Sequence, residues 1–139
     1  MQARTYRRLM SLPVLSAMIA VSIVSHMPNA PQPDLGIEFG DKVLHATAYM
    51  ILGLLFAAAL DAWRPIKPRS LALWTILFCA LFGFYDEIHQ SFIPNRFADV
   101  FDWLADSLGG VFAALLAGRL QVVLRTWRSK NVQAVTTTS

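Results

Sequence analysis

Four stretches of apolar residues, each about as long as a membrane-crossing helix, constrain the fold of this chain more than any other feature. A helix needs about 20 residues to cross roughly 30 Å of hydrocarbon, and it satisfies its backbone polar groups internally. The sequence therefore predicts an all-α, polytopic membrane protein folded as a bundle of four transmembrane helices. The expected helices cover approximately residues 9–27, 43–62, 70–90 and 99–121.

The composition supports lipid as the environment of this bundle. Of the 139 residues, 55% are hydrophobic and 15% are charged, which leaves too little polar surface to cover a compact globule in water. The single cysteine, Cys79, has no second cysteine for an intrachain disulfide or for a cysteine-based zinc site. The net charge of +3 follows from basic residues placed around a membrane, and it does not imply a nucleic-acid partner.

The basic residues fall almost entirely on one side of the predicted membrane. They lie before the first apolar segment, between the second and third, and after the fourth, whereas only Lys42 and Arg96 lie at the opposite ends. Lysine and arginine near helix ends favour the cytoplasmic side. We therefore expect a multi-pass protein of the bacterial cytoplasmic (inner) membrane with both termini in the cytoplasm.

The two ends of the chain are predicted to lie outside the bundle. Residues 1–8 form a basic cytoplasmic start, and residues 122–139 form a cytoplasmic tail in which 129–139 has the composition of a disordered segment. A cleaved signal peptide is the alternative interpretation of the first apolar segment. The prolines around its candidate cleavage position, Pro28 and Pro31, argue against it.

Polar side chains gather at the outer ends of the second, third and fourth apolar segments. Asp41, His45 and Tyr49 recur every four residues and so share one helix face. Ionisable groups inside a membrane are costly and need partners, water or a shallow position, so a group of them indicates a functional site. The candidate residues for ligand binding or for a polar network are Asp41, Lys42, His45, Tyr49, Asp86, Glu87, His89, Gln90, Arg96, Asp99, Asp102 and Asp106.

Two stretches carry a resemblance to a known family. "DKVLHATAYMILG" and "FGFYDEIHQSFIPNRFADVFDWLADSLGGVFAALL" resemble the VanZ-like family of small membrane proteins, and the resemblance covers roughly residues 39–118. Family members usually have Asn at the place of Asp106 and Gly at the place of Asn95. The residues that match the family pattern are Asp41, Lys42, His45, Tyr49, Asp86, Glu87, Gln90, Arg96, Asp99, Asp102 and Gly110.

The resemblance implies a polytopic membrane protein whose named member is associated with low-level resistance to the glycopeptide antibiotic teicoplanin. It implies no reaction. We therefore interpret the polar residues first as an outward-facing pocket for an amphiphilic ligand of the cell envelope: a lipid headgroup, a lipid-linked cell-wall precursor or a glycopeptide. Aromatic residues would surround this pocket, or would form a belt at the membrane interface. They are Phe84, Tyr85, Phe92, Phe97, Phe101 and Trp103.

An enzyme is the second interpretation. Histidine would act as a general base, and a divalent cation would bind a lipid phosphate as substrate. Oxygen-rich ligands favour Mg²⁺, Ca²⁺ or Mn²⁺ over Zn²⁺. No Gly-rich phosphate loop or cysteine nucleophile accompanies the cluster. Carboxylates expected to hold the cation are Asp86, Glu87, Asp102 and Asp106, and the candidate ligands singled out are His45, Asp86, His89 and Asp102.

A structural network is the third interpretation, in which Lys42 and Arg96 neutralise carboxylates of neighbouring helices. Two basic residues cannot pair with all the acids between Glu38 and Asp106, so some acids must be hydrated, protonated or bound to a cation. The first apolar segment carries no polar stripe and is expected to serve as an anchor. The sequence does not define the oligomeric state.

Small residues recur every four positions in the fourth apolar segment. They predict close helix packing, within one bundle rather than between two chains. The two rows are Gly109, Ala113, Ala117 and Gly110, Ala114, Gly118.

Overall fold

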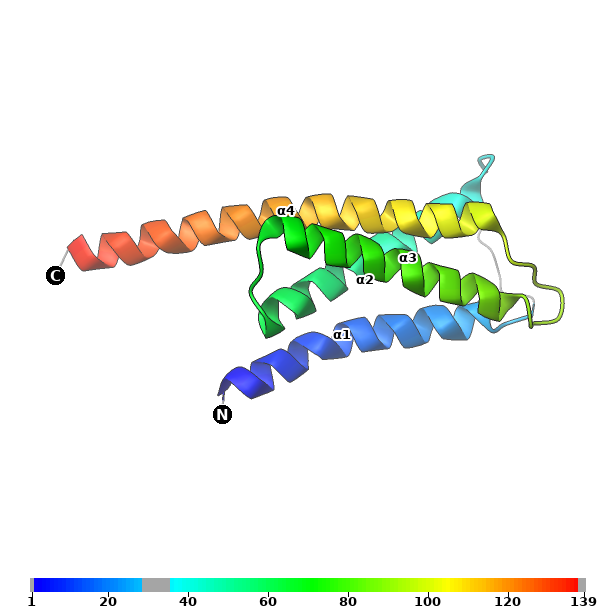
Figure 1. The fold of residues 1–139 in the computed structure, drawn as a ribbon, viewed down its shortest axis with the longest axis horizontal. Helices are drawn as coiled ribbons and strands as arrows, with labels where there is room; N and C mark the ends of the chain where they lie inside the picture. Colours follow the sequence, from blue (N-terminus) through cyan, green and yellow to red (C-terminus); the bar gives the residue numbers. More distant parts are fainter. Residues whose placement is uncertain (1, 29–35, 138–139) are drawn as a thin grey trace.

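The computed structural model describes the backbone of residues 2–28 and 36–137, and the side chains of Thr5 and of residues 7–28 and 36–122. Within these ranges the chain is helical and contains no strand. Four helices follow one another (Figure 1), and each contains a stretch long and apolar enough to cross a membrane. This confirms the predicted all-α fold with four membrane-spanning helices. The helices are α1 (Gln2–Ser25), α2 (Gly40–Trp63), α3 (Pro68–Gln90) and α4 (Val100–Thr137).

The end of α4 differs from the prediction. The apolar part of this helix, Val100–Val122, matches the expected fourth span, but the helix continues to Thr137 and extends beyond the bundle (Figure 1). The prediction of a disordered segment was therefore wrong for residues 129–137, and residues 138 and 139 lie outside the described part. The physical reason is that no glycine or proline follows Gly118, so the residues that break helices most strongly are missing from this stretch.

The helices alternate in direction, so that both chain ends lie at one end of the bundle and the polar segments meet at the other (Figure 1). Helix α4 packs along α2 and α3, and α1 lies mainly against α2. The share of the spanning stretch that is buried inside the bundle is 11% for α1, against 28% for α2, 33% for α3 and 39% for α4. Helices α2, α3 and α4 therefore form the core, and α1 covers one side of it.

Close contacts at small residues hold the three core helices together. A Cβ atom on Gly53 would lie 2.7 Å from the Cβ of Ala113, and one on Gly110 would lie 2.6 Å from the Cβ of Cys79. A Cβ atom on Gly109 would overlap the backbone carbonyl of Ala46. The predicted packing of small residues of α4 within the bundle is therefore observed at Gly109, Gly110 and Ala113, where glycine lets the helix backbones approach, but not at Gly118, whose Cβ would meet nothing within 4 Å.

The interior of the bundle is partly polar and its outer surface is apolar. Thr75 and Asp106 are completely buried, whereas Leu73 and Phe112 are 65% and 54% exposed. Exposed leucines and phenylalanines have lipid as their favourable surroundings in a membrane. Buried polar groups in such a bundle need partners from neighbouring helices, and the arrangement of those partners defines the site.

Candidate functional site

Lys42, in the first turn of α2, joins three carboxylates from two helix ends. Its Nζ atom lies 2.6 Å from Oδ2 of Asp99, 2.7 Å from Oδ1 of Asp102 and 2.9 Å from Oδ2 of Asp41. Since Asp99 and Asp102 belong to the start of α4, the lysine ties the beginnings of α2 and α4 together. The hydrogen bond from Lys42 holds the pKa of the Asp99 carboxyl below its ordinary value.

Asp99 also connects α3 with α4. Its Oδ1 atom accepts a 2.8 Å hydrogen bond from the backbone N–H of Phe101, which is the arrangement of a helix N-cap. Its own backbone N–H donates a 2.8 Å hydrogen bond to Oε2 of Glu87 near the end of α3. The turn between α3 and α4 is thereby fixed at both of its ends.

His45, Glu87 and Asp106 form a buried triad, with one residue from each core helix. Nδ1 of His45 lies 2.9 Å from Oδ1 of Asp106, and its Nε2 lies 3.8 Å from Oδ2 of Asp102. Each member of the triad offers one potential ligand atom, and these three atoms lie within 4.8 Å of one another. Oε1 of Glu87, Oδ2 of Asp106 and the hydroxyl of Tyr49 have no hydrogen-bond partner, although all three residues are buried.

Asp86 faces α1 instead of the triad. Its Oδ2 atom accepts hydrogen bonds of 2.6 Å from the Ser25 hydroxyl and 3.1 Å from the Gln90 amide. Ser25 is a member of the polar network that sequence reasoning missed, because α1 was expected to carry no polar group toward the cluster. The signal in the sequence was a hydroxyl at the outer end of the first apolar segment, at the depth of Asp86.

Arg96 binds the end of α1. Its Nε and Nη2 atoms donate hydrogen bonds of 3.2 Å to the carbonyl of Met27 and 3.4 Å to the carbonyl of Val24. The sequence left open whether this arginine pairs with a carboxylate of the protein or with an anionic ligand. In the structure it instead caps carbonyl groups at the C-terminal end of a helix, where a positive charge is favourable.

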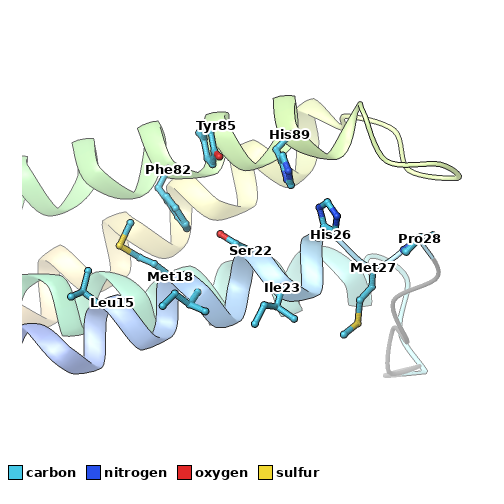
Figure 2. A pocket seen from close by; sticks show the side chains of 11 residues that line it. Leu15, Met18, Ser22, Ile23, His26, Met27, Pro28, Phe82, Tyr85 and His89 are labelled. Atoms are coloured by element: carbon cyan, nitrogen blue, oxygen red, sulfur yellow. The ribbon is translucent and has the colours of Figure 1, made fainter.

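His89 lies apart from the triad, in a groove between α1 and α3 that we call the α1–α3 groove. The groove has a volume of about 740 Å³, and Figure 2 shows its lining side chains converging from the two helices. The rings of His26 and His89 stack across it with centroids 5.2 Å apart, and Tyr85 stacks on His89 at 6.1 Å. His26, which follows the last residue of α1, is therefore the partner of a candidate site residue.

The structure thus divides the predicted site residues into separate groups. Of the four candidate metal ligands, His45 and Asp102 lie near each other, Asp86 faces α1, and His89 lines the groove. The aromatic side chains named from the sequence are exposed, except for Trp103, which is half-buried and donates a 2.9 Å hydrogen bond to the carbonyl of Ala80.

Comparison with known proteins adds a family and one relative. The family model described as VanZ/LLP1 matches residues 2–122. The uncharacterized protein C11E3.10 of Schizosaccharomyces pombe is 36% identical over 105 residues, which cover 74% of this chain and 61% of that relative. The chain therefore spans less than two thirds of the length of the relative. No solved structure matches the chain significantly.

Proposed function

Because the chain belongs to the VanZ/LLP1 family and is a multi-pass membrane protein with four spanning helices, we propose that it binds an amphiphile at the membrane surface. The apolar part of this ligand lies in the α1–α3 groove, and an anionic headgroup lies at the histidine end of that groove. The observation that carries the proposal is the groove itself, which is apolar along its length and ends at the stacked pair His26 and His89.

The lining of the groove suits a hydrocarbon chain. Met18 of α1 points toward Phe82 of α3 across it (Figure 2), and Leu15 and Ile19 of α1 complete its apolar lining. Its volume of about 740 Å³ lies within the range of about 300–1,000 Å³ that is typical of small-molecule sites. Since α1 and α3 both span the membrane, a lipid chain reaches the groove directly from the bilayer.

The polar end of the groove suits an anionic headgroup such as a phosphate. The imidazole rings of His26 and His89 lie at this end, and Arg96 binds the carbonyl of Met27, which itself lines the groove. Arginine and protonated histidine form strong hydrogen bonds with phosphate oxygens. The two acids nearest in sequence to His89, Asp86 and Glu87, are both buried; Asp86 is hydrogen-bonded to Ser25 and Glu87 to the backbone of Asp99, so neither faces such a headgroup.

Phospholipids and lipid-linked cell-wall precursors share this chemistry, because both carry phosphate on a hydrocarbon anchor. A relative in a yeast favours a ligand that bacteria and fungi have in common, which phospholipids are. Teicoplanin, suggested by the family resemblance, is an amphiphile of a different class and enters the test as a competitor. A contribution to glycopeptide resistance would follow from its binding in the groove.

We place the histidine end of the groove at the outer surface of a bacterial cytoplasmic membrane, with both chain ends in the cytoplasm. The support is the exposed basic turn between α2 and α3, which includes Arg64, Lys67 and Arg69 at the opposite end of the bundle. Reporter fusions at both chain ends test this topology: cytoplasmic reporters are active at both ends only in the proposed orientation.

Photo-crosslinking tests the binding proposal. The purified chain in nanodiscs is irradiated with a phospholipid that carries a photoreactive group on its acyl chain, and the labelled peptides are identified. We expect labels on both walls of the groove and at least about fivefold less labelling in Ser22→Trp, which fills it. Leu108→Trp, on a lipid-exposed face of α4, is the matched control and keeps the pattern of the wild type.

Headgroup specificity is measured by competition in the same assay. Phosphate-bearing lipids are expected to compete more strongly than a neutral diacylglycerol, and His26→Ala with His89→Ala removes this preference. Labelling that is uniform over the whole lipid-facing surface, or unchanged by Ser22→Trp, contradicts a specific groove. That result would favour the interpretation of the polar residues as a structural network, which the ion pairing of Lys42 with three carboxylates supports.

Hydrolysis of a lipid phosphate is a second candidate function, favoured by the 2.9 Å contact between His45 and the buried Asp106. The test of this function is whether the wild-type chain releases inorganic phosphate from a phosphatidic acid or a polyprenyl phosphate. This release should be lost in His45→Ala. Binding without release, over several such lipids, assigns the chain to recognition alone.

A further inference from the structure

We infer that His45, Glu87 and Asp106 form a binding site for a divalent transition-metal ion inside the bundle. This site is separate from the α1–α3 groove, and it would exist whether or not the groove binds a lipid. The argument rests on geometry, on unsatisfied buried oxygen atoms and on charge.

The triad has the spacing of a metal site that needs only small side-chain rotations. One potential ligand atom from each residue lies within 4.8 Å of the other two. Ligands at about 2.1 Å from a tetrahedrally coordinated ion are separated by about 3.4 Å. Nδ1 of His45 and Oδ1 of Asp106 are 2.9 Å apart as a hydrogen-bonded pair, so a small outward rotation of either side chain brings them to the separation of metal ligands.

Unsatisfied polar atoms point to a missing partner at this place. Asp106 is 0% exposed, Tyr49 is 1% exposed and Glu87 is 5% exposed, yet Oδ2 of Asp106, the Tyr49 hydroxyl and Oε1 of Glu87 have no hydrogen-bond partner. Buried polar groups are nearly always paired, because leaving them unpaired is costly. Tyr49 lies one helical turn after His45 on the same face of α2, which is the face that carries the triad.

The charges of the triad also favour a cation. Glu87 and Asp106 are two carboxylates in a bundle surrounded by lipid, and Lys42 is already bonded to three other carboxylates. Protonation of His45 supplies one positive charge and leaves one negative charge over. A divalent ion bound to two carboxylates and a neutral imidazole gives a group with no net charge, which is the arrangement that a low-dielectric interior favours.

The surroundings orient the ligands in the way of known metal sites. Oδ2 of Asp102 lies 3.8 Å from Nε2 of His45, so this nitrogen points toward a carboxylate while Nδ1 faces the triad. Oε2 of Glu87 is held by the backbone of Asp99, which leaves Oε1 for the ion. A Cβ atom on Gly83 would lie 2.8 Å from Oδ2 of Asp106, so glycine keeps the space for this carboxylate.

The ligand set indicates which ion fits. One imidazole and two carboxylates are three protein ligands with room for water, as in catalytic zinc sites, and Mn²⁺ accepts the same donors. The imidazole makes Mg²⁺ and Ca²⁺ less suitable, because these ions prefer sites built only from oxygen. The side chain of His45 is 21% exposed, so an ion reaches the triad from the surface at the start of α2.

Metal content of the purified chain tests the inference. The full chain, without an affinity tag, is treated with EDTA in detergent, incubated with Zn²⁺ or Mn²⁺, desalted and analysed by elemental mass spectrometry. We expect one ion per chain and an increase in melting temperature on metal addition. Asp106→Asn and Glu87→Gln, which keep the side-chain shape, should weaken binding at least tenfold, whereas Asp41→Asn, an acid outside the triad, should not.

A spectroscopic measurement on the unchanged chain covers the case in which the variants do not fold. Co²⁺ bound by one nitrogen and two oxygen ligands at low coordination number absorbs strongly in the visible range, and one equivalent of Zn²⁺ should remove that absorption. Failure of the wild type to retain any ion, or retention equal to that of folded Asp106→Asn, overturns the inference. The charges of the two carboxylates are then neutralised by protons instead of a metal ion.

Discussion

Replacing Lys42 with methionine removes the cation that three carboxylates share while keeping most of the side-chain length. The Asp41 and Asp99 side chains are 37% and 38% exposed, and ion pairs this open contribute about 0.5 kcal/mol each. Asp102 is 16% exposed. Loss of Lys42 leaves this largely buried carboxylate without a compensating charge. Breaking a fully buried pair costs about 3–5 kcal/mol, so we assign about 2 kcal/mol to the loss of this less buried pair. The sum predicts a destabilisation of about 3 kcal/mol.

Thermal unfolding of the purified chain in detergent measures this loss. At about 4 °C per kcal/mol, which suits a chain of this size, Lys42→Met should melt about 12 °C below the wild type. Lys67→Met, at an exposed lysine of the α2–α3 turn, is the matched control and should change the melting temperature little. Adding Asp102→Asn to Lys42→Met should restore part of the stability, because the uncompensated charge is then gone. If Lys42→Met has the same melting temperature as the Lys67→Met control, the assignment of Lys42 as the link between α2 and α4 is refuted.

Two further predictions concern helix packing and pH. Gly109→Ala should destabilise the bundle by about 1–3 kcal/mol, because the added Cβ would overlap the backbone of Ala46. Gly118→Ala is the control and should be neutral or stabilising, because its Cβ would meet nothing within 4 Å. Equal melting temperatures of the two variants would contradict the observed packing. The lowered pKa of Asp99 contributes stability that is present above pH of about 4 and is lost as the pH falls through the folded-state pKa, so Asp99→Asn should flatten the acid side of the profile of melting temperature against pH. A variant profile as steep as that of the wild type would assign the acid sensitivity to other groups.

The sequence predicted the spanning helices and most of the polar residues, because both follow from local rules. Length and apolar content define a span, and a four-residue repeat places His45 on the face of Asp41. Partner choice was not predictable. Successive residues in a helix are about 100° apart, so Glu87 turns toward the start of α4 while His89 turns toward α1. Which of these directions meets another helix depends on the position of α1, and the sequence does not contain that position.

Arg96 was unpredictable for a similar reason. An arginine beside many acids is expected to bind a carboxylate, but here the carbonyl groups of α1 lie within its reach. Lys42 takes three of the acids, so the remaining ones find partners on other helices or, as inferred for the triad, bind an ion. The number of charges was readable from the sequence, whereas their pairing required the positions of the helix ends.

The attachment of α1 explains why a groove and a rigid polar cluster coexist in so small a bundle. The core helices meet through glycines such as Gly53 and Gly110, where a single added methyl group would not fit. By contrast, α1 joins the bundle through apolar packing of Val14 and through the side-chain hydrogen bonds from Ser25 to Asp86 and from Trp63 to Ser11. The groove runs along the side of α1 that faces α3, from Leu15 to Pro28 just beyond the helix end. A hydrocarbon chain entering it would therefore displace side chains of α1 and α3 without disturbing the contacts of Lys42, which hold α2 and α4 together.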